Sequence, residues 1–515
     1  MKRIGIGVSD FKHLIEEDFY YFDKTKFIDE IIKDGAQVKL FTRPRRFGKT
    51  LNMSMLKYFF DIKKADENRK LFKDLYIEKT ESFKEQGQYP VIFLSLKDLK
   101  ARTCEEMERK IIIPLSDFLS EYEYLLNELT GINFENLKNI VYKKASIDDL
   151  TTALKFLTKI LYEKYNKKVV VLIDEYDSPL VSAYINGYYE SAKDFFKTFY
   201  SSVLKDNNYL QMGVLTGIIR VIKAGIFSDL NNLSVYSILD EKYDEDFGLT
   251  EKEVEQALKD YNIFEELNDV KFWYDGYKMG NKEVYNPWSI INFLDVKKLV
   301  AFWIKTSGNK LIKEILKTST IDVNESLTKL FNGEDVEETI TGNSDLSSLL
   351  NYEDVWELLV FSGYLTIKEK IDRRNYILKI PNQEIREFFK DREEVPKKIS
   401  EMMALYKYDD YSWNYKARNF YKQAKFMEDY EDDYQGEVGE ISGYYTTYHD
   451  LNEKQLRAYF TWRSEIRKGI YNKACTSFIY IYIYELLCGI GASSTYDTIN
   501  LTSQVFLYLF KPILI

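Results

Sequence analysis

The stretch Val38–Asp61, which reads VKLFTRPRRFGKTLNMSMLKYFFD, decides the fold of this chain. It opens with the short apolar run Val38–Thr42, which is typical of a buried strand. A loop ending in GKT at Gly48–Thr50 follows, and apolar side chains then recur at helical spacing over Leu51–Phe60. Strand, GKT loop and helix in this order are the context of a loop that binds phosphate groups.

We call Arg43–Thr50 the phosphate loop. The helix begins at GKT, so its free amide groups and the positive end of its dipole face into this loop. Lys49 would reach the β- and γ-phosphates of ATP, and the Thr50 hydroxyl would ligate Mg²⁺. The remaining residues that we expect to contact the nucleotide from the loop are Arg45, Arg46, Phe47 and Gly48.

One position of the phosphate loop departs from the full motif, which has a glycine five residues before the second glycine. Arg43 occupies that position. Arginine tolerates a positive φ less well than glycine, so we expect the entrance of the loop to differ from the usual form. The alternative is a basic strand-to-helix turn that happens to spell GKT. The strand before the loop and the amphipathic helix after it favour nucleotide binding.

A second stretch, Lys168–Leu180 (KVVVLIDEYDSPL), supports this interpretation. Its apolar, β-branched run Val169–Ile173 is typical of a strand buried on both faces of a parallel sheet. Asp174 at the end of that strand would hold Mg²⁺, and Glu175 would polarise the attacking water. The alternative is a buried strand with a polar exit. Asp177 and Ser178-Pro179 suggest a turn leaving the strand.

Further apolar runs at Val91–Leu96 and Gln211–Thr216 read as core strands, and helical patterns separate them. This alternation predicts an α/β fold, a P-loop NTPase parallel sheet with helices on both faces. Arg220, which closely follows the last of these strands, could act as a catalytic sensor arginine. A salt-bridged surface arginine explains it equally well. Phe22 could pack against adenine, although an aromatic residue here is more often core.

Helical patterns dominate after residue 250. A helix and two short strands near Val355–Ile367 and Tyr376–Ile380 would form a winged-helix-like element. The charged stretch Asp391–Lys398 contains Pro396 and marks a boundary. We therefore expect a P-loop domain at 4–232, a helical, winged-helix-like region at 233–390, and a mainly helical C-terminal module at 399–515.

Composition excludes several other classes. The formal net charge of −10 gives no general basic surface for nucleic acid, so nucleic-acid binding is unsupported. Two histidines and three scattered cysteines cannot form a zinc site by spacing, nor a disulfide framework. The N-terminus lacks the apolar core of a signal peptide, and the apolar stretch 474–491 is too short for a confident membrane span. We expect a cytoplasmic protein without a membrane segment.

Residues 4–389, about three quarters of the chain, resemble the bacterial AAA-ATPase-like family. The matching pieces are GVSDFKHLI, YYFDKTKFI, FTRPRRFGKTLNMSMLKYFF, VVVLIDEYDSPL, LTGIIRV, IFSDLNNL, WYDGY and VYNPWSIINFL. The resemblance implies that RPRRFGKT is the family's own variant of the phosphate loop. It also implies nucleotide contact at Gly48–Thr50 and the acidic motif at Asp174 and Glu175.

The tail resembles a different family. Residues 420–494 are similar to the helical domain found N-terminal to tellurite-resistance TerB modules, through KFMEDYEDDY, YYTTYHDLNEKQLRAYFTWRSEIRKG and FIYIYIYELLCGIG. Members of the AAA-ATPase-like family usually end in a nuclease-like domain instead. That domain needs an acid on one strand and E-x-K or Q-x-K on the next, and no such pair follows Phe389.

Three functions are open at this point. The first is a Mg²⁺-dependent ATPase that couples its nucleotide state to a conformational change in the helical C-terminal parts. The second is a scaffold of a defence or stress-response system that holds ATP without hydrolysing it. Glu175 separates the two, because a scaffold needs no acid to activate water. Nuclease-linked nucleic-acid processing is a weaker third. A protein partner, or a second copy of the chain, would bind through the helical C-terminal regions.

Overall fold

The computed structural model describes residues 1–219, 225–227, 230–303, 321–342 and 352–387. All of them belong to one compact unit, Met1–Glu393. The expected C-terminal module at 399–515 lies outside the described residues, and so does Arg220.

Five of the strands in the described residues form a parallel sheet in the order β2-β3-β4-β1-β5. Their bounds are β1 Val38–Thr42, β2 Val91–Ser95, β3 Val169–Asp174, β4 Leu210–Gly217 and β5 Leu233–Tyr236. The predicted α/β fold with a parallel sheet is therefore confirmed, and the four apolar runs are strands β1 to β4. The sequence did not indicate β5, because this edge strand is only half-buried and its four residues do not form an apolar run.

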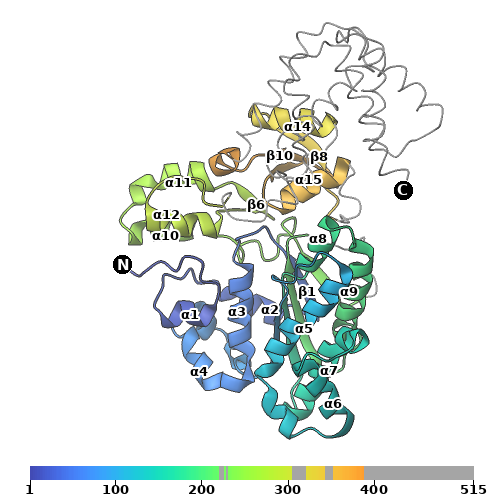
Figure 1. The fold of residues 1–515 in the computed structure, drawn as a ribbon. Helices are drawn as coiled ribbons and strands as arrows, with labels where there is room; N and C mark the ends of the chain where they lie inside the picture. Colours follow the sequence, from blue (N-terminus) through green and yellow to red (C-terminus); the bar gives the residue numbers. More distant parts are fainter. Residues whose placement is uncertain (220–224, 228–229, 304–320, 343–351, 388–515) are drawn as a thin grey trace, which may run out of the picture. The chain divides into compact units, whose positions relative to one another are not determined.

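Helices cover both sides of this sheet, with α3 on one side and α7 and α9 on the other (Figure 1). The helices up to β4 are α1 Phe11–Glu16, α2 Lys26–Lys33, α3 Lys49–Phe60, α4 Ala65–Arg69, α5 Cys104–Ser120, α6 Gly131–Val141, α7 Ile147–Tyr165, α8 Ser178–Ile185 and α9 Tyr189–Leu204. Short 3₁₀ turns are η1 Ile62–Lys64, η2 Lys70–Phe72, η3 Tyr76–Lys79, η4 Glu81–Glu85, η5 Glu123–Asn127 and, further on, η6 Phe264–Glu266. The turn expected after β3 is present at Tyr176 and Asp177, but Ser178 and Pro179 already begin α8, because proline is tolerated in the first turn of a helix.

The described residues after β5 form mainly helices and two small antiparallel sheets. Its helices are α10 Glu251–Asp260, α11 Leu267–Tyr274, α12 Pro287–Val296, α14 Ile321–Phe331 and α15 Tyr352–Phe361. Its strands are the pair β6 Tyr277–Met279 and β7 Lys282–Val284, and the sheet β8-β10-β9 with β8 Val336–Thr339, β9 Thr366–Lys370 and β10 Asn375–Lys379. The expected helix and two strands are α15, β9 and β10. Strand β8, with the sequence VEET, is too polar to show an apolar pattern.

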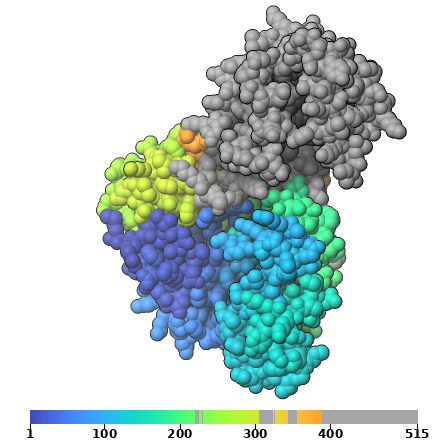
Figure 2. All heavy atoms as spheres, viewed as in Figure 1, coloured from blue at the N-terminus to red at the C-terminus, as the bar shows by residue number. Residues whose placement is uncertain are grey.

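Two hydrophobic clusters hold the unit together. The larger one extends from the parallel sheet into α15 and β10, and the smaller one lies among α10, α11 and α12. The N-terminal residues lie beside the smaller cluster (Figure 2), where Tyr20 Oη donates to Asp260 at 2.7 Å and Tyr261 Oη donates to the Lys2 carbonyl at 2.6 Å. Segments far apart in the sequence are thus packed around the sheet.

None of the described helices has the length and apolar character needed to span a bilayer.

Candidate functional site

The side chains expected to hold a metal meet at the carboxyl ends of three neighbouring strands. Helix α3 begins directly after Gly48, whose φ of 81° is readily adopted by glycine. In its first turn, Thr50 Oγ1 donates to Asp174 Oδ2 at 2.8 Å. From β4, which lies between β1 and β3, Thr216 Oγ1 donates to the other oxygen, Asp174 Oδ1, at 2.5 Å. The fold therefore brings together Thr50 and Asp174, which are 124 positions apart in the chain.

The environment of Asp174 suits a divalent cation. Burial raises the pKa of the Asp174 carboxyl, while the hydroxyls of Thr216 and Thr50 act in the opposite direction. The described residues contain no group of three His, Cys, Asp or Glu side chains that could hold a metal alone. Mg²⁺ in a nucleotide site does not require such a group, because one or two protein ligands suffice when phosphate oxygens and water complete its coordination. Thr50 and Asp174 fit that requirement.

Lys49 is a buried cation at the start of α3. Its ammonium donates to the Arg43 carbonyl at 2.9 Å and to the Pro44 carbonyl at 2.8 Å, so its side chain crosses the phosphate loop. Burial lowers the pKa of Lys49 to about 8, because desolvation disfavours the charged form. A phosphate group beside this ammonium would compensate for the missing solvation.

Arg43 explains how the loop forms without its first glycine. Its side chain is fully buried and donates from Nη1 to the Tyr236 carbonyl at 2.8 Å and from Nη2 to the Tyr243 carbonyl at 3.0 Å. The guanidinium also lies 5.0 Å from the ring centre of Phe247. Arg43 is not among the residues with a positive φ, so the backbone does not require glycine here. The side chain is bound to the last residue of β5 and to the segment after it, and it holds that segment against the loop entrance.

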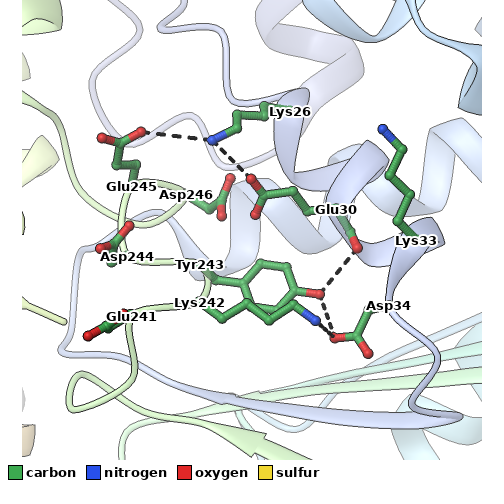
Figure 3. A pocket seen from close by; sticks show the side chains of 10 residues that line it. All are labelled: Lys26, Glu30, Lys33, Asp34, Glu241, Lys242, Tyr243, Asp244, Glu245 and Asp246. Carbon is green, nitrogen blue, oxygen red and sulfur yellow. Dashed lines mark hydrogen bonds and ion pairs between the residues drawn. The ribbon is translucent and has the colours of Figure 1, made fainter. Parts of the chain in front are cut away.

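The same segment lines a pocket of about 440 Å³ together with α2 (Figure 3). Tyr243 and Asp34 face one another across it and are joined by a 2.8 Å hydrogen bond, and Lys242 pairs with Asp34 at 2.7 Å. The pocket's charged lining comprises Lys26, Glu30, Lys33, Asp34, Glu241, Lys242, Asp244, Glu245 and Asp246. The six carboxylates outnumber the three lysines, so the pocket carries a net negative charge that repels phosphate. The pocket is therefore not the phosphate site. Burial lowers the pKa of Arg43 to about 10, and two acids of the pocket, Asp244 and Asp246, act in the opposite direction.

Glu175 and Asp177 follow Asp174 and have different surroundings. Glu175 is half-buried, has a left-handed φ of 52°, and accepts a hydrogen bond from Ser178 Oγ at 3.1 Å. Asp177 is buried and accepts from the backbone amides of Ile218 and Ile219 at 2.8 and 2.9 Å. Asp177 thus fixes the chain leaving β4, a role that its place in a supposed turn did not suggest. Glu175 remains the acid that solvent can reach.

The middle of the phosphate loop contacts two tryptophans. The Arg46 guanidinium lies 4.2 Å from the ring centre of Trp288, and Trp303 Nε1 donates to the Arg45 carbonyl at 3.1 Å. Phe47 is fully buried and its ring meets Tyr277 edge-on at 5.1 Å, so only its backbone can contact a ligand. The sequence did not single out either tryptophan, because aromatic residues at this density usually pack.

Of the two other candidate residues, the structure describes one. Phe22 packs against the cluster of α10, α11 and α12, with Tyr20 at 5.2 Å between ring centres. Arg220 lies outside the described residues.

Comparison with known proteins agrees with this geometry. Residues 5–227 match the model of a family described as a predicted AAA-ATPase, and residues 384–506 match the TerB N-terminal domain. Both resemblances seen in the sequence are therefore confirmed. A protein of Azotobacter chroococcum mcd 1, described as an uncharacterized protein in the vnfD 5' region, is 26% identical over 399 residues, which are 75% of this chain and 68% of that protein.

Proposed function

We propose that this chain binds Mg²⁺ and ATP at the phosphate loop and hydrolyses the bond between the β- and γ-phosphates of ATP. The observation that carries the proposal is the meeting of the helix α3 terminus, Thr50 and Asp174 at one edge of the parallel sheet. The match of residues 5–227 to a predicted AAA-ATPase supports it. A basic strand-to-helix turn would need neither a buried lysine nor an acid on a separate strand opposite its threonine.

Each residue of the site has a separate task in this proposal. Lys49 and the amides at the start of α3 bind phosphate oxygens. Thr50 and Asp174 hold Mg²⁺, which neutralises charge on the phosphates. Glu175 orients a water molecule and accepts its proton as the water oxygen bonds to the γ-phosphorus. The bond from that phosphorus to the bridging oxygen breaks, and ADP and phosphate leave.

The proposed coupling of nucleotide state to the rest of the chain rests on contacts of the loop. Arg43 is bound to the end of β5 and to the segment after it, and the Arg45 carbonyl accepts a hydrogen bond from Trp303. A shift of the loop on nucleotide binding would therefore reach residues outside the parallel sheet. A scaffold that binds ATP without turnover would share these contacts, so only turnover distinguishes the two functions.

The test is a calorimetric titration of the purified full chain with Mg·ATP, followed by phosphate release at saturating ATP. Lys49→Ala should weaken binding at least tenfold, because hydrogen bonds to charged groups contribute about 1.5–3 kcal/mol. Lys57→Ala is the matched control, because Lys57 lies at the other end of the same helix and pairs with Glu121 at 4.0 Å. Equal affinity of wild type and Lys49→Ala for Mg·ATP would contradict the proposal.

A further inference from the structure

Arg46 is the one cation in the middle of the described phosphate loop whose side chain is exposed. Its φ of 67° lies in the left-handed region, where an arginine is strained and a glycine is not. Residues held in such conformations cluster at functional sites. Since glycine would satisfy the backbone at lower cost, the strain indicates that the side chain itself is needed.

The surroundings of Arg46 leave its hydrogen-bond donors free for an anion. The guanidinium carbon lies over the Trp288 ring, 4.2 Å from its centre, and the side chain forms no hydrogen bond or ion pair with the residues that the structure describes. Stacking uses the flat face of a guanidinium, whereas its N–H donors lie around the edge. The indole can therefore fix the plane of the guanidinium without occupying any of its donors.

Trp288 is itself held in place from two directions. Asn286 Oδ1 accepts from the Trp288 amide at 2.9 Å at the start of α12. The next residue, Ser289, donates to the buried Glu384 carboxylate at 2.6 Å, and Glu384 also accepts from the Trp303 amide at 2.6 Å. The Glu384 carboxylate thus connects the backbone of Trp303 with the residue that follows Trp288, and Asn286 fixes the start of the helix that carries the ring under Arg46.

Arg46 has one acidic neighbour that acts on its charge. Burial lowers the pKa of Arg46, and the Glu175 carboxylate, which favours the charged guanidinium, acts in the opposite direction. The guanidinium is therefore near enough to interact with the acid proposed to activate water. In a nucleotide bound at the loop, the group nearest to that acid is the γ-phosphate.

We propose that Arg46 binds the γ-phosphate and that Trp288 positions it, so that the pair distinguishes ATP from ADP. This inference rests on the proposed function, because it assumes that the phosphate loop binds the nucleotide. It assigns the ATP preference to an arginine of the loop itself and to a tryptophan outside the parallel-sheet domain. Through α12 and Glu384, the same contact connects the γ-phosphate to the chain after β5.

The test compares affinities of the full chain for Mg·ATP and Mg·ADP. Arg46→Gln should weaken the affinity for Mg·ATP about tenfold or more, which is the scale of a charge-assisted hydrogen bond. It should change the affinity for Mg·ADP by less than about threefold. The matched control is Arg69→Gln, because Arg69 is an exposed arginine stacked on Phe83 at 4.3 Å on α4. Equal losses for ATP and ADP in Arg46→Gln would overturn the assignment.

Trp288 variants test the positioning role. Trp288→Leu should lower the ATP preference and Trp288→Phe, which keeps an aromatic face, should retain most of it. In the Arg46→Gln background, Trp288→Leu should cause no further loss of the ATP preference.

The fluorescence of wild type should respond differently to Mg·ATP and Mg·ADP, and Trp288→Phe should lose that difference. If Trp288→Leu lowered the ATP preference as much in the Arg46→Gln background as in wild type, the proposal that Trp288 acts by positioning Arg46 would be contradicted. Failure of wild type to bind either nucleotide would instead refute the proposed function, and this inference with it.

Discussion

Thr50 and Asp174 are joined by a 2.8 Å hydrogen bond from the threonine hydroxyl to the carboxylate, although β4 lies between the strands that precede them. The bond connects the first turn of α3 with the end of β3. Thr216 donates to the second oxygen of the same carboxylate from β4. Three segments of the chain therefore converge on one buried acid, and this convergence is the basis of the proposed metal site.

Removing the charge of Asp174 should affect the metal-dependent part of nucleotide binding. We expect Asp174→Asn to keep the shape of the side chain, with one threonine hydroxyl donating to its oxygen and the other accepting from its amide nitrogen. It should lose the advantage that Mg²⁺ gives to ATP affinity. The measurement is a pair of ATP titrations, with Mg²⁺ and with a chelator, for wild type and variant. A variant whose affinity still rises with Mg²⁺ as strongly as that of wild type would exclude Asp174 as the metal ligand.

The lowered pKa of Lys49 predicts a pH dependence of binding. With a pKa of about 8 in the free protein, Lys49 is mostly neutral above that pH. A bound phosphate raises this pKa, so binding above about pH 8 must take up a proton, and affinity should fall by up to about tenfold per pH unit. Calorimetry at pH 8.5 in buffers of different ionisation enthalpy would detect the proton. No proton uptake in wild type would contradict the predicted titration of Lys49, and the same uptake in Lys49→Ala would show that another group titrates.

The strain at Arg46 can be measured separately from its role in binding. Arg46→Gly and Arg46→Ala both remove the guanidinium, but only alanine retains a Cβ at the φ of 67°. The glycine variant should be more stable than the alanine variant by about 1 kcal/mol in urea unfolding. Gly48→Ala, at a φ of 81°, should lower stability in the same experiment. Equal stability of the two Arg46 variants would mean that the backbone there is unstrained.

The parallel sheet could be predicted from the sequence because its inner strands are continuous apolar runs. The run at Val169–Ile173, followed directly by an acid, indicated a buried strand whose end faces a ligand. The half-buried strand at Leu233–Tyr236 gave no such pattern. Elements whose local sequence decides their burial were therefore predicted, and elements that depend on their neighbours were not.

The candidate site shows the same division. The spacing of GKT and the adjacent acids predicted Lys49, Thr50 and Asp174 as one group. The partners of Arg43 and Arg46 could not be predicted, because Tyr236 and Trp288 lie some 190 and 240 residues further along the chain, and no local pattern encodes contacts at such separation. The resemblance to a family supplied the expectation that Arg43 belongs to a variant phosphate loop, and the buried contacts of its side chain explain how that loop forms without glycine at this position.

A shortened chain tests whether the described unit is independent of the tail. The compact unit ends at Glu393, close to the boundary expected from the charged stretch with Pro396. A chain that stops after Glu393 should fold cooperatively and bind Mg·ATP with the affinity of the full chain. The checks are thermal unfolding and the same calorimetric titration. Aggregation together with loss of binding would show that the tail completes the core of this unit.

The proposal that the chain hydrolyses ATP with Glu175 as the base is tested by phosphate release from wild type and Glu175→Gln at saturating Mg·ATP. Glutamine keeps the size and polarity of Glu175 but cannot accept the proton of the attacking water. We expect wild type to release phosphate. The variant should bind Mg·ATP with similar affinity but release phosphate about 10²-fold more slowly, the scale of general-base catalysis. Equal rates in both proteins would contradict the catalytic role of Glu175, and binding without turnover in wild type would contradict hydrolysis itself.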